Sequence, residues 1–229
     1  LKYKIENKCE PLVNFNYKIY KGIYTGFNEA FIINDKTKND IINKSNKTLK
    51  FIKPILRGRD ITKYGYEDKK LWMITIPSGW TNKQCRPNEA EKFMRQNYSE
   101  ILDHLEHIDK SILVKKGKGL KKRHDMGDYW WELRDCDYYN FFKEKKIIWI
   151  ELSDENKFSL CEKEFYLLAG TFMLVGKDLE LLNAYLNSKI ALYLFNLIGS
   201  SFLLTIVSLY MLVMGTSAVG IKYKLSFVT

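Results

Sequence analysis

Six basic side chains fall within nine residues in the segment Lys115–Arg123, whose sequence is KKGKGLKKR. Glycines in such a segment permit close approach of the backbone and leave amide groups free for phosphate oxygens, while lysine and arginine neutralise phosphate charge. The competing interpretation is a solvated loop, which is what most charge runs are. On the first interpretation, the phosphate contacts are Lys115, Lys116, Lys118, Lys121, Lys122 and Arg123.

An aromatic segment follows the basic one without a gap, with the sequence HDMGDYWWELR over residues 124–134. Tandem tryptophans beside a dense basic segment suit stacking or wedging at nucleic acid. One of Trp130 and Trp131 is expected to belong to the core instead, and Trp130 is the candidate for a contact with the ligand. Arg134 is a further candidate for a base or phosphate contact.

A second basic cluster occurs in KPILRGRDI, residues 53–61. Two arginines on either side of one glycine, Arg57 and Arg59, suit bidentate recognition of guanine or the clamping of a phosphate. The alternative is a structural turn in which Arg59 pairs with Asp60. Asn28, in another segment, is an additional candidate contact.

Motifs for catalysis are missing. Transfer of a methyl group to an amino group needs an Asn/Asp-Pro-Pro-Tyr/Phe motif, and none of the four prolines is adjacent to another. Glu144-Lys145-Lys146 and Glu155-Asn156-Lys157 each supply half of a metal-nuclease motif, but no Pro-Asp precedes them. We therefore expect no catalytic centre and no cofactor in this chain.

Metal binding by the cysteines or histidines is also not expected. Cys9, Cys85, Cys136 and Cys161 are far apart and form no C-x-x-C pair, so free thiols in a reducing cytoplasm are the expectation. His104 and His107 have a spacing that could hold a metal on a helix, but no third ligand lies near them in sequence. No secretory signal is visible at the start, and a first residue other than Met suggests a piece of a longer protein.

The composition agrees with a folded protein that has a polyanionic partner. The 229 residues are 46% apolar and 14% aromatic, which is enough for a core. The formal charge of +10 favours nucleic acid first and an anionic membrane surface second. An AT-rich genome, however, enriches lysine without any ligand.

The elements that would position these residues mix strands and helices without regular alternation, which favours an α+β fold with a mixed sheet and packed helices. Strands are predicted at residues 30–33, 71–76, 147–150 and 170–175, and a hairpin at 158–168. Residues 35–50 are expected to be an exposed loop or a short surface helix. Helices are predicted at about 89–108, with Asn88 as N-cap, and at about 179–198.

Four ordered segments resemble successive blocks of the TaqI-like C-terminal specificity domain. They are GIYTGFNEAFII (22–33), KPILRGRDI (53–61), WWELRDCDYYNFFKEKKIIWIELS (130–153) and LLNAYLNSKI (181–190). This domain occurs in adenine-N6 DNA methyltransferases and in type IIG restriction-modification enzymes, and the resemblance covers residues 19–200.

The resemblance implies a target-recognition domain at residues 1–200 that grips double-stranded DNA and selects the site. Methyltransferase or nuclease domains of a parent enzyme would be the partners. Those domains would bind S-adenosylmethionine, methylate a flipped adenine and use Mg²⁺ for any cleavage.

After residue 200 the sequence departs from the family pattern and becomes an apolar tail, 201–229. Residues 190–221 contain no charged side chain. A degraded or frame-shifted end is one explanation, and a membrane span over residues 200–220 of a basic anchored protein is another. A restriction endonuclease with an unrecognised nuclease site is the third alternative for the whole chain.

Overall fold

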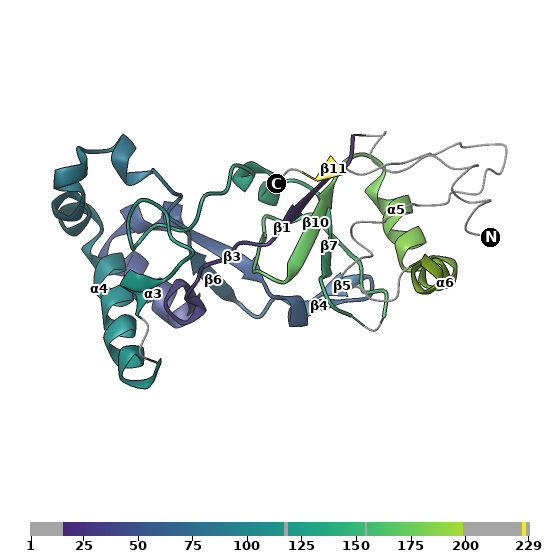
Figure 1. Cartoon of the computed structure of the whole chain (residues 1–229), viewed down its shortest axis with the longest axis horizontal. Coiled ribbons are helices and arrows are strands. Elements are labelled where there is room, and N and C mark those ends of the chain that lie inside the picture. Colours follow the sequence, from purple (N-terminus) through teal and green to yellow (C-terminus); the bar gives the residue numbers. More distant parts are fainter. Residues whose placement is uncertain (1–15, 117–118, 154, 199–225, 228–229) are drawn as a thin grey trace. The chain divides into compact units, whose positions relative to one another are not determined.

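The structure, a computed structural model, describes residues 16–116, 119–153, 155–198 and 226–227 (Figure 1). The chain passes back and forth between two compact units. Unit 1 contains Leu1–Gly22, Leu56–Glu67 and Asn140–Thr229, and unit 2 contains Ile23–Ile55 and Asp68–Tyr139. Both units combine strands with packed helices, so the predicted α+β class is confirmed.

A five-stranded mixed sheet forms the centre of unit 1, in the order β11-β1-β10-β7-β8. Its strands are β1 (Lys18–Lys21), β7 (Lys146–Ile150), β8 (Ser159–Cys161), β10 (Thr171–Val175) and β11 (Ser226–Phe227). Neighbours are antiparallel except β1 and β11, which are parallel. The strands predicted at 147–150 and 170–175 are therefore confirmed. The predicted hairpin at 158–168 is wrong, because β8 pairs with β7 and not with β9 (Tyr166–Leu167).

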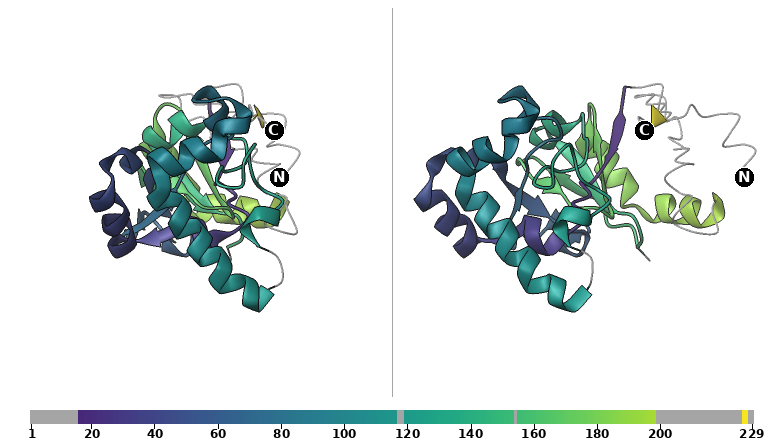
Figure 2. Two further views of the ribbon diagram at one scale, coloured as in Figure 1. Left: turned by 90° about the vertical axis from the view of Figure 1, so that its left-hand side faces the viewer. Right: turned by 60° about the vertical axis from the view of Figure 1, so that its left-hand side comes forward.

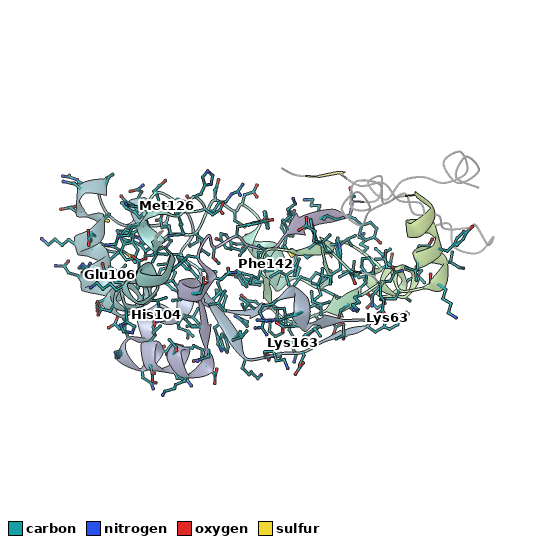
Figure 3. All side chains as sticks on the ribbon, turned by 60° about the horizontal axis from the view of Figure 1, so that its bottom comes forward. Lys63, His104, Glu106, Met126, Phe142 and Lys163 are labelled. Atoms are coloured by element: carbon teal, nitrogen blue, oxygen red, sulfur yellow. The ribbon has the colours of Figure 1, made fainter. Side chains whose placement is uncertain are left out.

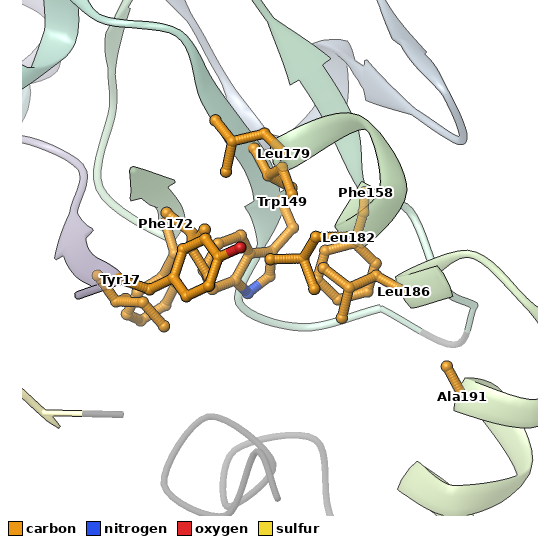
Figure 4. Close-up of a cluster of buried hydrophobic side chains, with 11 residues drawn as sticks. Tyr17, Trp149, Phe158, Phe172, Leu179, Leu182, Leu186 and Ala191 are labelled. Atoms are coloured by element: carbon orange, nitrogen blue, oxygen red, sulfur yellow. The ribbon is translucent and has the colours of Figure 1, made fainter. Parts of the chain in front are cut away.

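The core of unit 1 lies on the face of this sheet that α5 (Leu179–Leu186) covers (Figure 4). Trp149 stacks on Phe172, with ring centroids 5.6 Å apart. Every residue of β10 is buried, as expected for a central strand with covered faces. The buried members are Tyr17, Ile19, Ile147, Trp149, Phe158, Phe172, Leu174, Leu179, Leu182, Leu186 and Ala191.

The single helix predicted at 179–198 is two helices, α5 and α6 (Lys189–Ile198). Asn187 causes the break: its Nδ2 donates to the Phe158 carbonyl at 2.8 Å, and its Oδ1 accepts from the Phe158 amide at 3.2 Å. Ser188 then starts the second helix, since its Oγ accepts the Ala191 amide as an N-cap does.

Short elements that lie between β1 and β7 in sequence also contribute to unit 1. The 3₁₀ turn η3 (Gly58–Asp60) leads into a hairpin of β4 (Ile61–Thr62) and β5 (Gly65–Tyr66). The 3₁₀ turn η7 (Tyr139–Lys143) precedes β7. Near it, the fully buried Lys146 donates through Nζ to three carbonyls, those of Phe142, Glu144 and Lys163.

Unit 2 contains an antiparallel group of strands in the order β2 (Ile32–Asn34), β6 (Leu71–Ile74) and β3 (Ile52–Leu56). The strand predicted at 30–33 begins two residues later, because Ala30 and Phe31 end the short helix α2 (Asn28–Phe31). The segment predicted as a loop or surface helix contains α3 (Asp35–Lys44), followed by η2 (Asn46–Phe51).

The long helix α4 (Ala90–Lys116) packs against α2 and α3 (Figure 2). It follows the turns η4 (Thr81–Lys83) and η5 (Pro87–Glu89), and it is kinked at Tyr98, whose φ and ψ are −144° and 37°. Its apolar positions are buried as the period predicted, including Met94, Ile101 and Leu105. The prediction of a helix here is confirmed, although the helix is longer than expected.

The predicted apolar tail lies outside the described residues except for β11. Among the residues that are described, no helix is both long and apolar enough to cross a membrane.

Candidate nucleic-acid interface

The basic segment Lys115–Arg123 is divided between two local structures of unit 2. The backbone of Lys115 and Lys116 forms the end of α4, and Lys118 lies outside the described residues. The chain then continues through the 3₁₀ turn η6 (Leu120–Lys122). The Leu120 amide anchors this turn by donating to Oδ1 of the buried Asp109 on α4, at 2.5 Å.

Arg123, predicted as a phosphate contact, faces the interior and is only 7% exposed. Its guanidinium donates to the carbonyls of Leu120, Asp125, Trp130 and Glu132. It also lies over the Phe31 ring, 4.7 Å from the centroid. Burial lowers the pKa of Arg123 to about 10. These contacts give Arg123 the role of holding residues 120–132 in shape, which corrects the prediction from the sequence.

Glu132 is the second organising residue, and sequence reasoning missed it. Its carboxylate is fully buried and accepts three backbone amides: Thr81 on Oε1 at 2.9 Å, and Gly79 and Asp128 on Oε2, both at 3.0 Å. A carboxylate that accepts backbone amides forms strong, charge-assisted hydrogen bonds. Glu132 therefore ties the turn after β6 to the aromatic segment.

The two tryptophans have different surroundings, as predicted. Trp131 is 2% exposed, stacks on Tyr129 at a centroid distance of 4.8 Å, and donates from Nε1 to the Thr81 hydroxyl. Trp130 is half-buried, and Lys121 Nζ lies 4.6 Å from its ring centroid. Trp131 is thus the core residue of the pair, and Trp130 is the one that borders the surface.

Exposed cations line this segment. Lys121 and Arg134 have side chains that are 50% and 61% exposed, and Lys122 is also exposed. Two of them have acidic neighbours, since Lys121 Nζ lies 3.2 Å from Glu106 Oε1 and Arg134 Nη1 lies 3.4 Å from Asp125 Oδ1. The cationic ends of both pairs are open to solvent, which screens the pairs and leaves the two cations accessible to a phosphate.

Asn28 is brought close to this segment by the turn before it. A side chain at Gly26 would place its Cβ 3.0 Å from Arg123 Cδ and 3.1 Å from Asp125 Cβ, so any other residue would require these side chains to shift. Gly26 also has a φ of +67°. Asn28 begins α2, is exposed, and accepts the Thr25 hydroxyl at 2.6 Å. It therefore joins the candidate surface of unit 2.

Both arginines of the second basic cluster belong to unit 1, and one of them has a structural role. Arg57, not Arg59, pairs with the buried Asp60: Nε and Nη2 lie 2.9 and 2.7 Å from its two oxygens, and the Arg57 amide donates as well. Burial alone would raise the pKa of Asp60, but the hydrogen bonds from Arg57 outweigh it and hold that pKa below its ordinary value. Arg59 is exposed and remains the candidate contact of this cluster.

Two side chains that could take part in metal or nuclease chemistry, His104 and Lys146, contact backbone carbonyls in the structure. Among the described side chains, no group of three or more His, Cys, Asp or Glu could hold a metal ion. His104, labelled in Figure 3, contacts the Ala30 carbonyl through Nε2 at 3.1 Å. Lys146, the lysine of one nuclease half-motif, is buried on backbone carbonyls, and burial lowers its pKa.

The fold and the site together define a candidate domain for binding a polyanion. Exposed cations extend from residues 119–134, whose backbone is held by the buried hydrogen bonds of Arg123 and Glu132. Residues 53–212 match the TaqI-like C-terminal specificity domain, and the chain belongs to this family. The match includes three of the four sequence blocks and begins after the first, residues 22–33.

Two solved restriction-modification enzymes are similar to the chain in structure. The type IIL enzyme MmeI, solved in complex with DNA, is 12% identical with a TM-score of 0.46, over 78% of this chain and 21% of that one. The type IIG restriction endonuclease BpuSI is 15% identical with a TM-score of 0.42, over 79% of this chain and 20% of that one. The chain thus spans about a fifth of each enzyme. No curated protein matches the sequence.

Proposed function

We propose that this chain reads the sequence of double-stranded DNA as the specificity module of a type IIG restriction-modification enzyme or an adenine-specific DNA methyltransferase. The observation that carries the proposal is the rigid support beneath the exposed cations of unit 2. Arg123 and Glu132 fix the backbone from inside, so Lys121, Lys122 and Arg134 extend from a backbone whose shape is set before binding. Family membership supports the same function.

A backbone that is already fixed favours binding, because a flexible backbone would have to become ordered when its side chains contact DNA. A segment already held by buried hydrogen bonds loses less conformational entropy when it meets DNA. Phosphate contacts fix the register of the protein on the duplex, and base contacts then select the site. In this proposal Lys121 and Lys122 contact phosphates, while Arg134, Asn28 and Trp130 border the bases or their backbone. Lys115, Lys116, Lys118 and Arg59 are further candidate phosphate contacts.

The chemistry belongs to other domains of the parent enzyme. Those domains would bind S-adenosylmethionine and, for any cleavage, Mg²⁺, while this chain supplies the position of the duplex. The free thiols of Cys85, Cys136 and Cys161 support a reducing cytoplasm as the compartment.

Selection from a library of duplexes with a randomised centre tests this proposal. The 229-residue chain should enrich one sequence pattern over several rounds, and it should bind the enriched duplex at least about 10³-fold more tightly than a scrambled duplex. Binding without enrichment would indicate a non-specific DNA protein. Absence of binding at low salt would refute the proposal.

A further inference from the structure

The hairpin of β4 and β5 in unit 1 ends in a strained and exposed tyrosine. Lys63 and Tyr64 are the two residues between the paired Thr62 and Gly65. Tyr64 has a φ of +64°, the left-handed region that glycine and asparagine adopt most readily in turns. Gly65 follows directly in sequence, but the tyrosine and not this glycine adopts the left-handed conformation. The tyrosine therefore costs stability where it stands.

The strain is not offset by burial of the ring. Tyr64 is 58% exposed, among the most exposed large side chains of the described residues. The Lys63 ammonium lies 5.6 Å from its ring centroid, and Lys63 is exposed as well (Figure 3). An aromatic ring and a cation are thus presented together at the end of a two-stranded turn.

The hairpin is held both at its turn and at its base. In the turn, the Tyr64 amide donates to the Phe158 carbonyl at 3.1 Å, and at the base the Glu67 amide donates to the Asp60 carbonyl at 2.8 Å. Asp60 is itself held by the bidentate pair with Arg57 described above. Ile61 is buried, and Tyr66 packs edge-on against Phe165 at 5.5 Å. The RGRD sequence therefore builds the support of a hairpin whose end carries the exposed side chains.

We infer that the Lys63–Tyr64 turn is a second DNA-contacting element, separate in sequence from the segment 119–134. Tyr64 packs against a base or sugar edge in a groove, and Lys63 neutralises a neighbouring phosphate. The backbone of the turn is bonded to Phe158, so the exposed side chains of Lys63 and Tyr64, rather than the hairpin as a whole, reach a groove of duplex DNA. The net charge of +10 and the exposed Arg59 at the base of the hairpin favour a polyanionic partner. This inference rests on the proposed function.

The test compares Tyr64→Gly and Lys63→Ala with the unchanged 229-residue chain, using fluorescence anisotropy on a 30-base-pair duplex across a salt series. Tyr64→Gly should weaken binding about tenfold at every salt concentration, because an aromatic contact with a base is not ionic. Its log-log salt slope should stay unchanged. Lys63→Ala should instead reduce that slope by about one.

A measurement of stability distinguishes the loss of a DNA contact from the loss of folded structure. Removing the left-handed tyrosine should leave Tm unchanged or raise it by about 2 °C, so weaker binding by Tyr64→Gly would not reflect unfolding. The matched control is Tyr193→Ala, which removes another exposed tyrosine of unit 1, 57% exposed on α6, and should bind as the unchanged chain does.

Three outcomes overturn the inference. Binding by Tyr64→Gly as tight as that of Tyr193→Ala and of the unchanged chain would show that the turn does not meet DNA. A fall in Tm of Tyr64→Gly that accounts for its weaker binding would make the tyrosine structural. Failure of the unchanged chain to bind any duplex would refute the proposed function together with the inference, whereas the first two outcomes leave the proposed function intact.

Discussion

Buried polar side chains of unit 2 act mainly on backbone groups, and this is what shapes the candidate interface. Arg123 satisfies carbonyls and Glu132 satisfies amides, so the two residues hold an irregular segment that has little regular secondary structure. Buried backbone groups need such partners because an unpaired one costs free energy. The interface depends on residues that themselves face away from it.

Replacing Glu132 should therefore destabilise the protein strongly. Glu132→Ala leaves three backbone amides, the Thr81 one buried and two partly buried, without their acceptor, and we expect it to lower the free energy of unfolding by about 3 kcal/mol, measured by urea denaturation. Glu132→Gln keeps one carbonyl oxygen and should lose less. Glu89→Ala, at an exposed position of unit 2, should change the value by less than about 0.5 kcal/mol. A loss for Glu132→Ala as small as the one for Glu89→Ala would contradict the role of the carboxylate.

His104 should make stability depend on pH. Burial is the main cause that lowers its pKa below the ordinary value of 6.5, and the charge of His107 adds to this. The unfolded chain then takes up the proton at higher pH than the folded one does, so stability falls as the pH drops below about 6.5. Thermal melts from pH 8 to pH 5 should show a smaller decline for His104→Gln. His107→Gln, at an exposed position, should leave nearly the same decline as the unchanged chain.

At the scale of elements, the long periodic segments were the predictable part. The helix at 89–108 and the strands at 147–150 and 170–175 follow directly from apolar spacing, and the structure contains all three. The break between α5 and α6 could not be predicted, because Asn187 ends the helix by bonding to Phe158, 29 residues earlier in sequence. The hairpin predicted at 158–168 was wrong for the same reason, because β8 pairs with β7, a strand outside that segment.

The candidate site was predictable in position but not in the role of each residue. Spacing alone located the basic and aromatic segments and predicted that one tryptophan would be buried. It could not separate Arg123 from Lys121 and Lys122, because a charge run does not reveal which member turns inward. For Glu132, the only signal was an acid among aromatic residues, which is too common to identify a buried carboxylate.

Replacing Lys121 and Lys122 tests whether η6 binds phosphates. Lys121→Ala combined with Lys122→Ala should weaken binding to duplexes of different sequence by similar factors and reduce the log-log salt slope by about two. The matched control is the double change Lys36→Ala and Lys44→Ala, which removes two exposed lysines from α3 of the same unit. An unchanged slope in the first variant, or an equal reduction in the control, would mean that the η6 lysines are merely solvated.

At the scale of the whole molecule, sequence order and spatial units do not coincide. Unit 1 is assembled from three separate stretches, and unit 2 is built from two stretches inserted between them. The segment Leu56–Glu67 returns from unit 2 to unit 1 and carries both the Arg57–Asp60 pair and the β4–β5 hairpin. Each proposed DNA-contacting element is thus supported within its own unit, and a variant in one unit can be compared with a control in the same unit.

The contribution of the tail can be tested by shortening the chain to residues 1–200. The family match continues to residue 212, but residues 190–221 carry no charge that could meet a phosphate. In the described part of the tail, only Ser226 and Phe227 pair with β1, at the edge of the sheet. We therefore expect the shortened chain to keep its circular dichroism spectrum and its affinity for the selected duplex within about twofold, since loss of one short edge strand leaves the central pairing of β1 with β10 intact. It should also aggregate less in size-exclusion chromatography, because a long uncharged apolar run favours association. An unfolded shortened chain beside a monomeric full-length one would instead place the tail in the core of unit 1.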